Sequence, residues 1–248
     1  MPKLSSSSLQ ATVSPGVLPS NAASGSVSGF SDSIARLSDR IDYRLANSDK
    51  QREAIFRLRY QAYVRDGTIS PNSSRTFSDV YDETGNVYLL GLYIDDELAS
   101  SIRLHTASSK HPNFPSLEMF ADVLQPEPDA GKVIVDASHI VADESHSRLH
   151  RELPYATLRL CMLAARYFRA DHLLAVVGAQ HRMFYERALN YRPMCKSRPY
   201  PPSAKPISLM TIPYRAAADE LNRRFPFFRS TFFERRMLFE RPMRAFAT

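Results

Sequence analysis

Three consecutive stretches decide the fold: KVIVDASHIV at residues 132–141, ELPYATLRLCMLAARYFR at residues 152–169 and HLLAVV at residues 172–177. The first and third stretches are rich in β-branched and other apolar residues, which favours buried strands. The second repeats its apolar side chains with helical spacing. Because a strand, a helix and a strand in this order form a parallel pair with a right-handed crossover, we expect an α/β sheet with a helix packed on it.

The chain before this unit predicts a hairpin. Residues 87–94 and 98–105 read as strands, and the short Asp95-Asp96 joint between them suits a tight turn. A hairpin that leads into a strand–helix–strand unit gives an α+β fold with a mixed, mostly antiparallel central sheet flanked by helices. The other predicted elements are helices over about 48–65, 117–124 and 179–189, and a strand over 207–212.

Composition changes at both ends of the chain. Residues 1–35 are rich in Ser, Gly and Pro with few large apolar side chains, so we predict a disordered leader. Ordered structure is expected from about Ile41, in one domain over residues 40–215. Residues 216–248 interleave arginines with phenylalanines and are predicted to pack on the domain. Contact with an anionic membrane, or stacking on single-stranded nucleic acid, are the alternatives for this extension.

Overall composition limits the function classes. With 44% hydrophobic residues, the 248-residue chain is long and apolar enough for one packed domain. The net charge of +6 favours acidic partners, but the absence of a Lys-rich run makes nucleic acid an unlikely one. The two cysteines form no CxxC pair, and the chain has neither a secretory signal nor an apolar run of about 18 residues. We therefore expect a cytoplasmic protein.

Polar residues interrupt the apolar elements in three places. They are Arg59 with Tyr63 in the first helix, Asp79 with Asp82 in the following loop, and Asp136, Ser138 and His139 in the strand over 132–141. Strand alternation puts Asp136, Ser138 and Ile140 on one face and His139 on the other. A carboxylate among apolar neighbours needs a partner or a function, and Arg103 is the expected partner. A structural ion network and a functional site are both compatible with this pattern.

Six separated motifs occur along the chain. They are RYQAY at 59–63, FSDVYD at 77–82, SIR at 101–103, VDASH at 135–139, ELPY at 152–155 and PFFRST at 226–231. In this order they resemble the bacterial N-acyl amino acid synthases of the FeeM type and, more distantly, the LuxI-type acyl-homoserine lactone synthases. The resemblance covers about residues 45–240. It implies a GNAT-like acyltransferase fold and transfer of a long acyl chain from an acyl carrier protein to the α-amine of an amino acid.

The resemblance also implies roles for the polar residues. Asp136 falls where the LuxI-type enzymes have a Glu base, and His139 falls where they have an Arg. Because Asp is shorter than Glu, we expect a bridging water between Asp136 and the amine. The predicted catalytic residues are Asp136, Ser138 and Arg103, and the predicted substrate-binding residues are Arg59, Tyr63, Asp79, Asp82 and His139.

The chemistry of amide formation is consistent with this assignment. Acyl transfer needs a neutral amine, and a buried carboxylate with a raised pKa is a sufficient base for an α-amino group. Backbone N–H groups of a bulged strand would hold the oxyanion. No side-chain nucleophile is required, so Cys161 is not expected to act as one. His146 and His150 lie four residues apart without a third ligand, so we predict no metal site.

The acyl donor has its own signal in the sequence. Acyltransferases that use CoA carry a glycine-rich pyrophosphate loop after the base-bearing strand, but residues 132–177 contain no glycine. We therefore predict no bound cofactor, with the acyl-phosphopantetheine of a carrier protein as donor. Arg148, Arg151 and Arg159 are predicted to meet the phosphopantetheine phosphate or the carrier protein; a solvated helix face is the alternative. The predicted acyl pocket is Leu117, Phe120, Met162, Phe184 and Tyr185, which plain core packing explains equally.

Two rival functions remain open. A synthase of acyl-homoserine lactones would bind a sulfonium substrate, and the chain has no Trp for the strongest cation–π contact. A non-catalytic basic module binding anionic lipid or nucleic acid is the second rival, and a steep salt dependence of binding would identify it.

Overall fold

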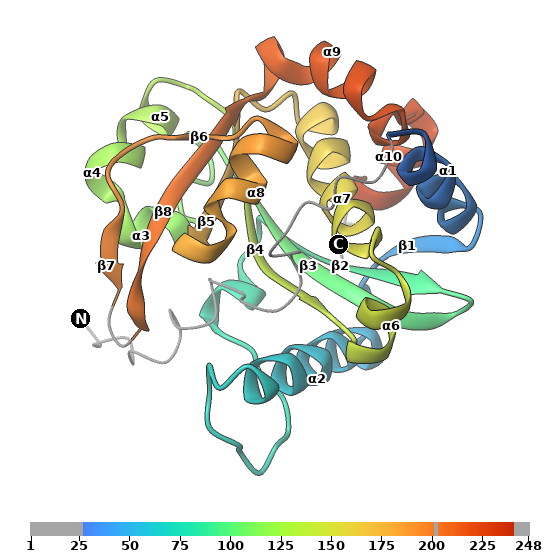
Figure 1. Cartoon of the computed structure of the whole chain (residues 1–248). Coiled ribbons are helices and arrows are strands. Elements are labelled where there is room, and N and C mark those ends of the chain that lie inside the picture. Colours follow the sequence, from blue (N-terminus) through green and yellow to red (C-terminus); the bar gives the residue numbers. More distant parts are fainter. Residues whose placement is uncertain (1–26, 201–202, 241–248) are drawn as a thin grey trace, which may run out of the picture.

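One sheet runs through the part of the chain that the computed structural model describes, residues 27–200 and 203–240 (Figure 1). The strand order is β1-β2-β3-β4-β5-β8-β6, with β7 also paired to β8. The strands are β1 (Ile41–Leu45), β2 (Val87–Ile94), β3 (Glu97–Ala107), β4 (Ile134–Ala142), β5 (His172–Gly178), β6 (Arg192–Pro193), β7 (Arg198–Tyr200) and β8 (Ser203–Pro213). Only β4 and β5 are parallel neighbours among these strands, so the predicted mixed, mostly antiparallel sheet is confirmed.

Helices cover both faces of this sheet. They are α1 (Val27–Ser38), α2 (Asp49–Arg65), η2 (Val80–Glu83), α3 (Pro115–Met119), α4 (Ala121–Leu124), α5 (Pro126–Asp129), α6 (Glu144–Leu149), α7 (Leu153–Tyr167), α8 (Ala179–Leu189), α9 (Tyr214–Arg224), η3 (Pro226–Phe228) and α10 (Phe232–Phe239). Figure 1 shows α2 beneath the sheet and α7 above it. None of the described helices combines the length and apolar character that a membrane span requires.

Local sequence signals account for the first helix and the hairpin. The Ser48 hydroxyl accepts from the Gln51 N–H, and Gln51 Oε1 accepts from the Ser48 N–H. This capping box starts α2 close to residue 48, where the helix was predicted to begin. In the hairpin turn, Asp95 and Asp96 have φ of 50° and 67°. Two successive positive φ angles define a type I′ turn, whose twist matches that of the flanking strands.

Alternate residues of β4 and β5 feed two separate cores. Val135 packs with Leu173 in the core under α7, whereas Ile134 packs with Leu174 in a second core that α3 and α4 cover. All four side chains are fully buried. The two faces of the sheet therefore have different surroundings. A strand residue lies in one core or the other according to the face on which its side chain projects.

A β-bulge changes the face on which His139 lies. The register between β3 and β4 pairs Ser101 with Val141 but Arg103 with Ser138, which leaves one extra residue on β4, and His139 has φ of 49°. Ile140 accordingly packs in the α7 core. The predicted strict alternation was therefore wrong beyond Ser138, because the bulge turns His139 to the face of Asp136.

Both chain ends depart from the predicted boundaries. Helix α1 lies partly within the segment predicted to be disordered, because Ile34 and Leu37 are apolar enough to be buried; residues 1–26 of that segment lie outside the described residues. The predicted boundary at residue 215 falls inside α9. Beyond it, Phe239 of α10 packs edge-on against Tyr88 of β2, with ring centroids 5.7 Å apart.

Candidate active site

Two buried arginines meet two carboxylates beneath the sheet. Arg59 of α2 donates from Nη1 to both oxygens of Asp82, at 2.8 and 3.0 Å. Arg103 of β3 donates from Nη1 to Asp79 at 2.5 Å and to Asp82 at 3.1 Å. The side chains of Arg59, Arg103 and Asp82 are 0% exposed. The structure therefore brings together four of the predicted site residues in one ion network.

The short helix η2 fixes the spacing of the two carboxylates. Asp79 accepts from the Tyr81 N–H at 2.9 Å, and the Asp79 N–H donates to Asp82 Oδ2 at 2.9 Å. This reciprocal capping holds both carboxylates in place, and the same capping oxygens, Asp79 Oδ1 and Asp82 Oδ2, also accept from Arg103 and Arg59. The FSDVYD motif is thus a rigid two-carboxylate clamp.

Charge pairing controls the protonation of this clamp. Burial alone would raise the pKa of Asp82, but the positive charges of Arg59 and Arg103 outweigh it and lower that pKa to about 2. For Asp79, burial is likewise outweighed by a hydrogen bond with His139 and by the charge of Arg103, which hold its pKa well below its usual range. Both carboxyl groups are therefore ionised at neutral pH.

A hydrogen-bonded chain of Tyr63, His139 and Asp79 borders the network. The Tyr63 hydroxyl lies 2.7 Å from His139 Nδ1, and His139 Nε2 lies 3.0 Å from Asp79 Oδ2. Burial, reinforced by the charge of Arg103, lowers the pKa of His139 to about 4. The neutral ring must donate from Nε2 to the carboxylate, so Nδ1 accepts a hydrogen bond from the Tyr63 hydroxyl. This arrangement fixes the imidazole tautomer.

Asp136 lies on the same face of the sheet but outside the ion network. It is fully buried, and both of its oxygens accept from Ser116 of α3: Oδ2 from the backbone N–H at 3.1 Å and Oδ1 from the hydroxyl at 2.6 Å. Burial raises the pKa of Asp136 to about 6, against the opposing effect of the Ser116 hydrogen bonds. The site thus contains a carboxyl group tuned close to neutral pH.

The predicted direct pairing of Asp136 with Arg103 was wrong. Arg103 instead donates from Nε to Ser138 at 3.0 Å and directs Nη1 at Asp79 and Asp82. Ser116 was missed, because it lies 20 residues upstream in a Pro-containing segment without periodic pattern. Pro115 at the start of α3 is the one local signal that would have placed Ser116 in a first helical turn, with its N–H free to donate.

His105 completes the polar face. It stands opposite Asp136 in the β3–β4 register, and its Nε2 lies 3.0 Å from the Tyr81 carbonyl oxygen and 3.1 Å from the Thr84 hydroxyl. Burial and the charge of Arg103 lower the pKa of His105 to about 3, so its ring is neutral. Its place in the site was not anticipated, because strand alternation alone does not reveal cross-strand register.

The three arginines predicted to contact the acyl donor lie in two different places in the structure. Arg148 and Arg151 are exposed around the end of α6, where Arg148 pairs with Glu144. Arg159 is only 14% exposed and belongs to another contact: it pairs with Glu234 and donates from Nε to the Phe227 carbonyl oxygen at 2.6 Å. The prediction for Arg159 was wrong, because the C-terminal extension folds back over that side of α7.

The predicted acyl pocket does not form one slot. Leu117 and Phe120 belong to the core under α3 and α4, whereas Met162, Phe184 and Tyr185 belong to the α7 core on the other face of the sheet. A sheet separates the two groups, so no single chain can lie against all five residues. Apolar character alone does not tell the two faces apart, which is why the sequence grouped them.

Comparisons with known proteins agree with this architecture. The model of the N-acyl amino acid synthase FeeM family matches residues 54–213. No curated protein sequence matches the chain. The solved structure of FeeM, an N-acyl amino acid synthase from uncultured soil microbes, is similar with a TM-score of 0.58 at 17% identity, covering 70% of this chain and 90% of FeeM.

Two lactone synthases share the fold. The CoA-dependent acyl-homoserine lactone synthase BjaI has a TM-score of 0.54 at 16% identity, over 75% of this chain and 89% of BjaI. The AHL synthase LasI has a TM-score of 0.51 at 13% identity, over 69% of this chain and 89% of LasI. These likenesses confirm the GNAT-like fold. Since the family model matches more than half of the residues, the chain belongs to the FeeM family of N-acyl amino acid synthases and is an N-acyltransferase.

Proposed function

We propose that this N-acyltransferase joins a long acyl chain, carried as a thioester on an acyl carrier protein, to the α-amine of a free amino acid. The observation that carries the proposal is Asp136, a wholly buried carboxyl group whose pKa is raised to about 6. It lies two residues along β4 from Ser138, the partner of Arg103, and on the same face of the strand. A base and a cationic anchor therefore stand side by side on one face.

Unused donors in the arginine pair fit a substrate carboxylate. Among the described residues, Arg59 Nε and Nη2 and Arg103 Nη2 are buried without a hydrogen-bond partner. Buried donors of this kind are costly unless a ligand satisfies them. A carboxylate is the anion whose two oxygens match a guanidinium fork. We assign the α-carboxylate of the amino acid to these donors.

Tyr81 covers the arginine and sets the route of entry. Its ring centroid lies 5.8 Å from the Arg103 guanidinium carbon, and its hydroxyl donates to Glu118 of α3 at 2.9 Å. This hydrogen bond is exposed, so separating it costs little. In our proposal the amino acid enters when the Tyr81–Glu118 contact opens, and α3 also carries Ser116, which holds the base.

The reaction then follows from the protonation states. Asp136 takes one proton from the α-ammonium group, directly or through a water, and the neutral amine attacks the thioester carbonyl carbon. The C–N bond forms, the C–S bond breaks, and the second amine proton leaves with the thiolate. We assign the oxyanion to backbone N–H groups at the His139 bulge, where the strand departs from its ladder.

The helix termini after β4 support a carrier protein as donor rather than CoA. The Asp143 carboxylate already accepts from the Ser145 and His146 N–H groups that start α6, at 3.0 and 3.1 Å. At α7, the Leu153 N–H donates to the His150 carbonyl oxygen at 3.1 Å, and the next residue is Pro154, which has no N–H. These termini therefore offer a pyrophosphate few free donors.

The test is a direct assay of amide formation. Purified protein is incubated with a long-chain acyl carrier thioester and mixed amino acids, and acyl amides are sought by mass spectrometry. Parallel reactions contain acyl-CoA instead of the carrier thioester, or S-adenosylmethionine instead of amino acids. An amide from the carrier donor is expected. Failure to form an amide with any amino acid, while circular dichroism reports a folded protein, would overturn the proposal.

An Arg148→Ala, Arg151→Ala double variant separates donor binding from chemistry. We expect it to raise KM for the carrier thioester while leaving kcat nearly unchanged, since both side chains are exposed and take no part in the proton transfer to Asp136. The matched control is Arg75→Ala, which removes an exposed arginine from the loop after α2. Equal KM values for the double variant and the control would exclude Arg148 and Arg151 from the donor site.

A further inference from the structure

A cationic cavity lies at the end of the molecule opposite α2. The cavity is about 490 Å³ in volume and lies between the last turn of α7, helix α9 and the segment from η3 to α10. Its charged lining consists of Arg166, Arg223, Arg229 and Arg235, and Asp219 is the one carboxylate that the described part of the chain adds to it. Four guanidinium groups around a single carboxylate leave a large excess of positive charge.

That charge is not neutralised within the fold. Arg235 donates from Nη1 to the Ser230 carbonyl oxygen and hydroxyl, at 2.7 and 2.8 Å, which are uncharged partners. Within residues 27–200 and 203–240, Arg166, Arg223 and Arg229 form no ion pair. Arg166, Arg223 and Arg229 are also exposed. The cavity therefore presents available guanidinium groups to an anion from outside the molecule.

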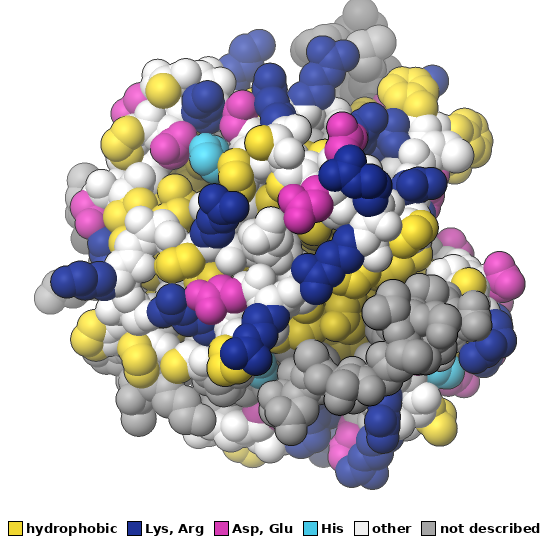
Figure 2. All heavy atoms as spheres, turned by 45° about the horizontal axis from the view of Figure 1, so that its top comes forward, with side chains coloured by type: hydrophobic (Ala, Val, Ile, Leu, Met, Phe, Trp, Pro, Cys, Tyr) yellow, Lys and Arg dark blue, Asp and Glu magenta, His cyan; other side chains and the backbone are white. Residues whose placement is uncertain are grey.

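Exposed apolar side chains lie on α10, the helix that also supplies Arg235 to the cavity. Phe232, Phe233 and Met237 are 65%, 70% and 69% exposed, whereas Leu238 and Phe239 on the other side of the helix are buried. Figure 2 brings this end of the molecule forward and shows Lys and Arg side chains spread among hydrophobic ones. Large apolar groups exposed next to cations are unusual on a monomer and mark an interaction surface.

We propose that this surface docks on an anionic phospholipid bilayer. Lipid phosphates occupy the arginine cavity, and the three apolar side chains of α10 enter the boundary between head groups and acyl chains. The apolar side chains favour a bilayer over nucleic acid, because Met237 has no ring to stack on a base and gains only from leaving water. Arginine suits the phosphates, since its planar fork binds two oxygens at once.

The docking surface is independent of the proposed acyl transfer. It uses none of the residues around Asp136 and Arg103, so it can fail while the enzyme still acts, and the reverse also holds. If both proposals are right, a long-chain product formed in the protein has a bilayer beside it to accept it.

Vesicle sedimentation tests the proposal with the full chain. Phosphatidylcholine vesicles with and without phosphatidylserine are mixed with the protein at low and high salt. We expect binding to the anionic vesicles alone, and release by salt. Equal binding to both vesicle types, or to neither, overturns the proposal.

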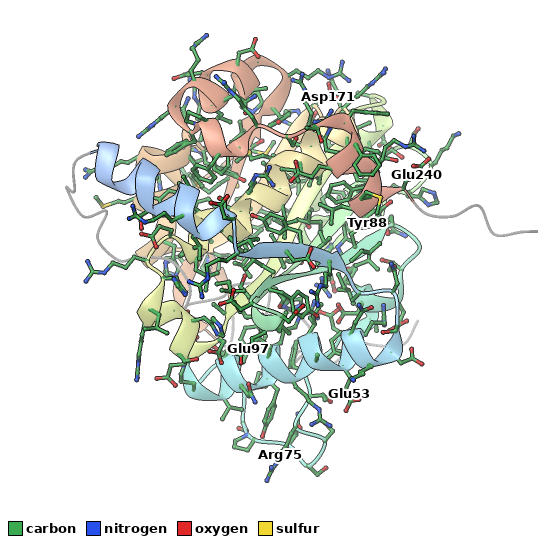
Figure 3. The ribbon with its side chains drawn as sticks, turned by 90° about the vertical axis from the view of Figure 1, so that its right-hand side faces the viewer. Glu53, Arg75, Tyr88, Glu97, Asp171 and Glu240 are labelled. Carbon is green, nitrogen blue, oxygen red and sulfur yellow. The ribbon has the colours of Figure 1, made fainter. Side chains whose placement is uncertain are left out.

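Two variants separate the contributions of charge and apolar contact. The first is a triple variant that removes charge, Arg166→Gln, Arg223→Gln, Arg229→Gln. The second is a triple variant that removes apolar contact, Phe232→Ser, Phe233→Ser, Met237→Ser. We expect each to weaken binding to anionic vesicles more than tenfold. The matched control is Arg75→Gln, an exposed arginine beyond α2 at the far end of the molecule (Figure 3). Thermal melts check the fold of each variant, and variants that bind like wild type overturn the assignment of the surface.

Two further outcomes would reassign the surface. Salt-sensitive binding of a DNA or RNA oligonucleotide without vesicle binding would make it a nucleic-acid site. A dimer by light scattering that dissociates on the α10 substitutions, again without vesicle binding, would make it a self-association face. Either result overturns bilayer docking. Acyl transfer measured with a soluble donor is expected to be unchanged in the docking variants, which keeps the two proposals distinguishable.

Discussion

Two wholly buried carboxyl groups lie under the same sheet and behave in opposite ways. Asp82 has a pKa lowered to about 2, and Asp136 has a pKa raised to about 6. Burial pushes both values upward, so burial does not explain the difference. Asp82 accepts from Arg59 and Arg103, whereas Asp136 accepts only from the uncharged groups of Ser116. The charge of the donor thus decides whether a buried carboxylate is a fixed anion or a proton acceptor.

The largest effect on activity is expected from removing the proton acceptor, Asp136. Asp136→Asn keeps the size of the side chain, its Oδ1 can still accept from the Ser116 N–H, and its amide N–H can donate to the Ser116 hydroxyl oxygen, but it cannot take a proton, so we expect kcat/KM to fall by about 10²–10⁴-fold. Urea denaturation at pH 8 is expected to show no loss of stability, because the variant no longer buries a charge. Asp122→Asn, on an exposed carboxylate, is the control. A fully active Asp136→Asn enzyme would remove Asp136 from the mechanism.

The next effect breaks the fixed anion. Asp82→Asn leaves Arg59 and Arg103 short of negative charge in a buried site, so we expect the free energy of unfolding to fall by about 3–5 kcal/mol. Urea denaturation measures it. The control is Glu53→Gln on the outer side of α2 (Figure 3), whose ion pair with Arg57 is more than half exposed and worth under about 1 kcal/mol. Similar losses of unfolding free energy in both variants would show that the buried ion network stabilises the fold no more than an exposed ion pair does.

Acid should weaken the fold through the two buried histidines. The native pKa values of His139 and His105 are about 4 and about 3, below the ordinary 6.5. As the pH falls below 6.5, both histidines become protonated in the unfolded chain but stay neutral in the native protein, which lowers the free energy of unfolding. Asp136, raised to about 6, acts in the opposite direction below pH 6. Two histidines outweigh one carboxyl, and we expect a net loss of about 2 kcal/mol between pH 6.5 and about pH 5.

Denaturant titrations across this pH range measure the slope. His139→Asn is expected to flatten it, and Asn adopts the positive φ of the bulge more readily than most residues. A slope that is unchanged in this variant would contradict the assignment of His139 as a neutral, buried group.

The smallest expected effect retunes the proton acceptor without removing it. Ser116→Ala deletes the hydroxyl that donates to Asp136 at 2.6 Å and lowers its pKa. The pKa of Asp136 should rise, so the acid limb of the kcat/KM profile should move upward by about one pH unit, which lowers kcat/KM about fivefold at pH 6. The high-pH plateau should change little. A profile that falls uniformly at every pH would indicate a loss of geometry instead.

The sequence predicted the features that depend on local pattern. The helix that begins near residue 48, the hairpin turn at Asp95 and the crossover from β4 to β5 all follow from residues close together in the chain. The order of the motifs also predicted the family, and Arg59 and Asp82, which pair in the structure, were both predicted substrate-binding residues.

Features that depend on distant contacts escaped prediction. Ser116 reaches Asp136 across 20 residues, and nothing in its surroundings marks it as a partner. The bulge at His139 adds one residue to a strand whose apolar spacing looks regular, so alternation assigned the wrong face. The sheet that divides Phe120 from Met162 is likewise invisible in a list of apolar residues.

Arg159, in the middle of the chain, depends on hydrogen-bond partners that come much later in the sequence. Its guanidinium group is satisfied by Glu234, 75 residues later, and by the carbonyl oxygen of Phe227, 68 residues later. During synthesis the helix that carries Arg159 leaves the ribosome long before these partners exist, since translation adds only about 5–20 residues per second. This face of the domain therefore closes only after α10 has left the ribosome, and a chain cut short before Glu234 would leave Arg159 without its counter-charge.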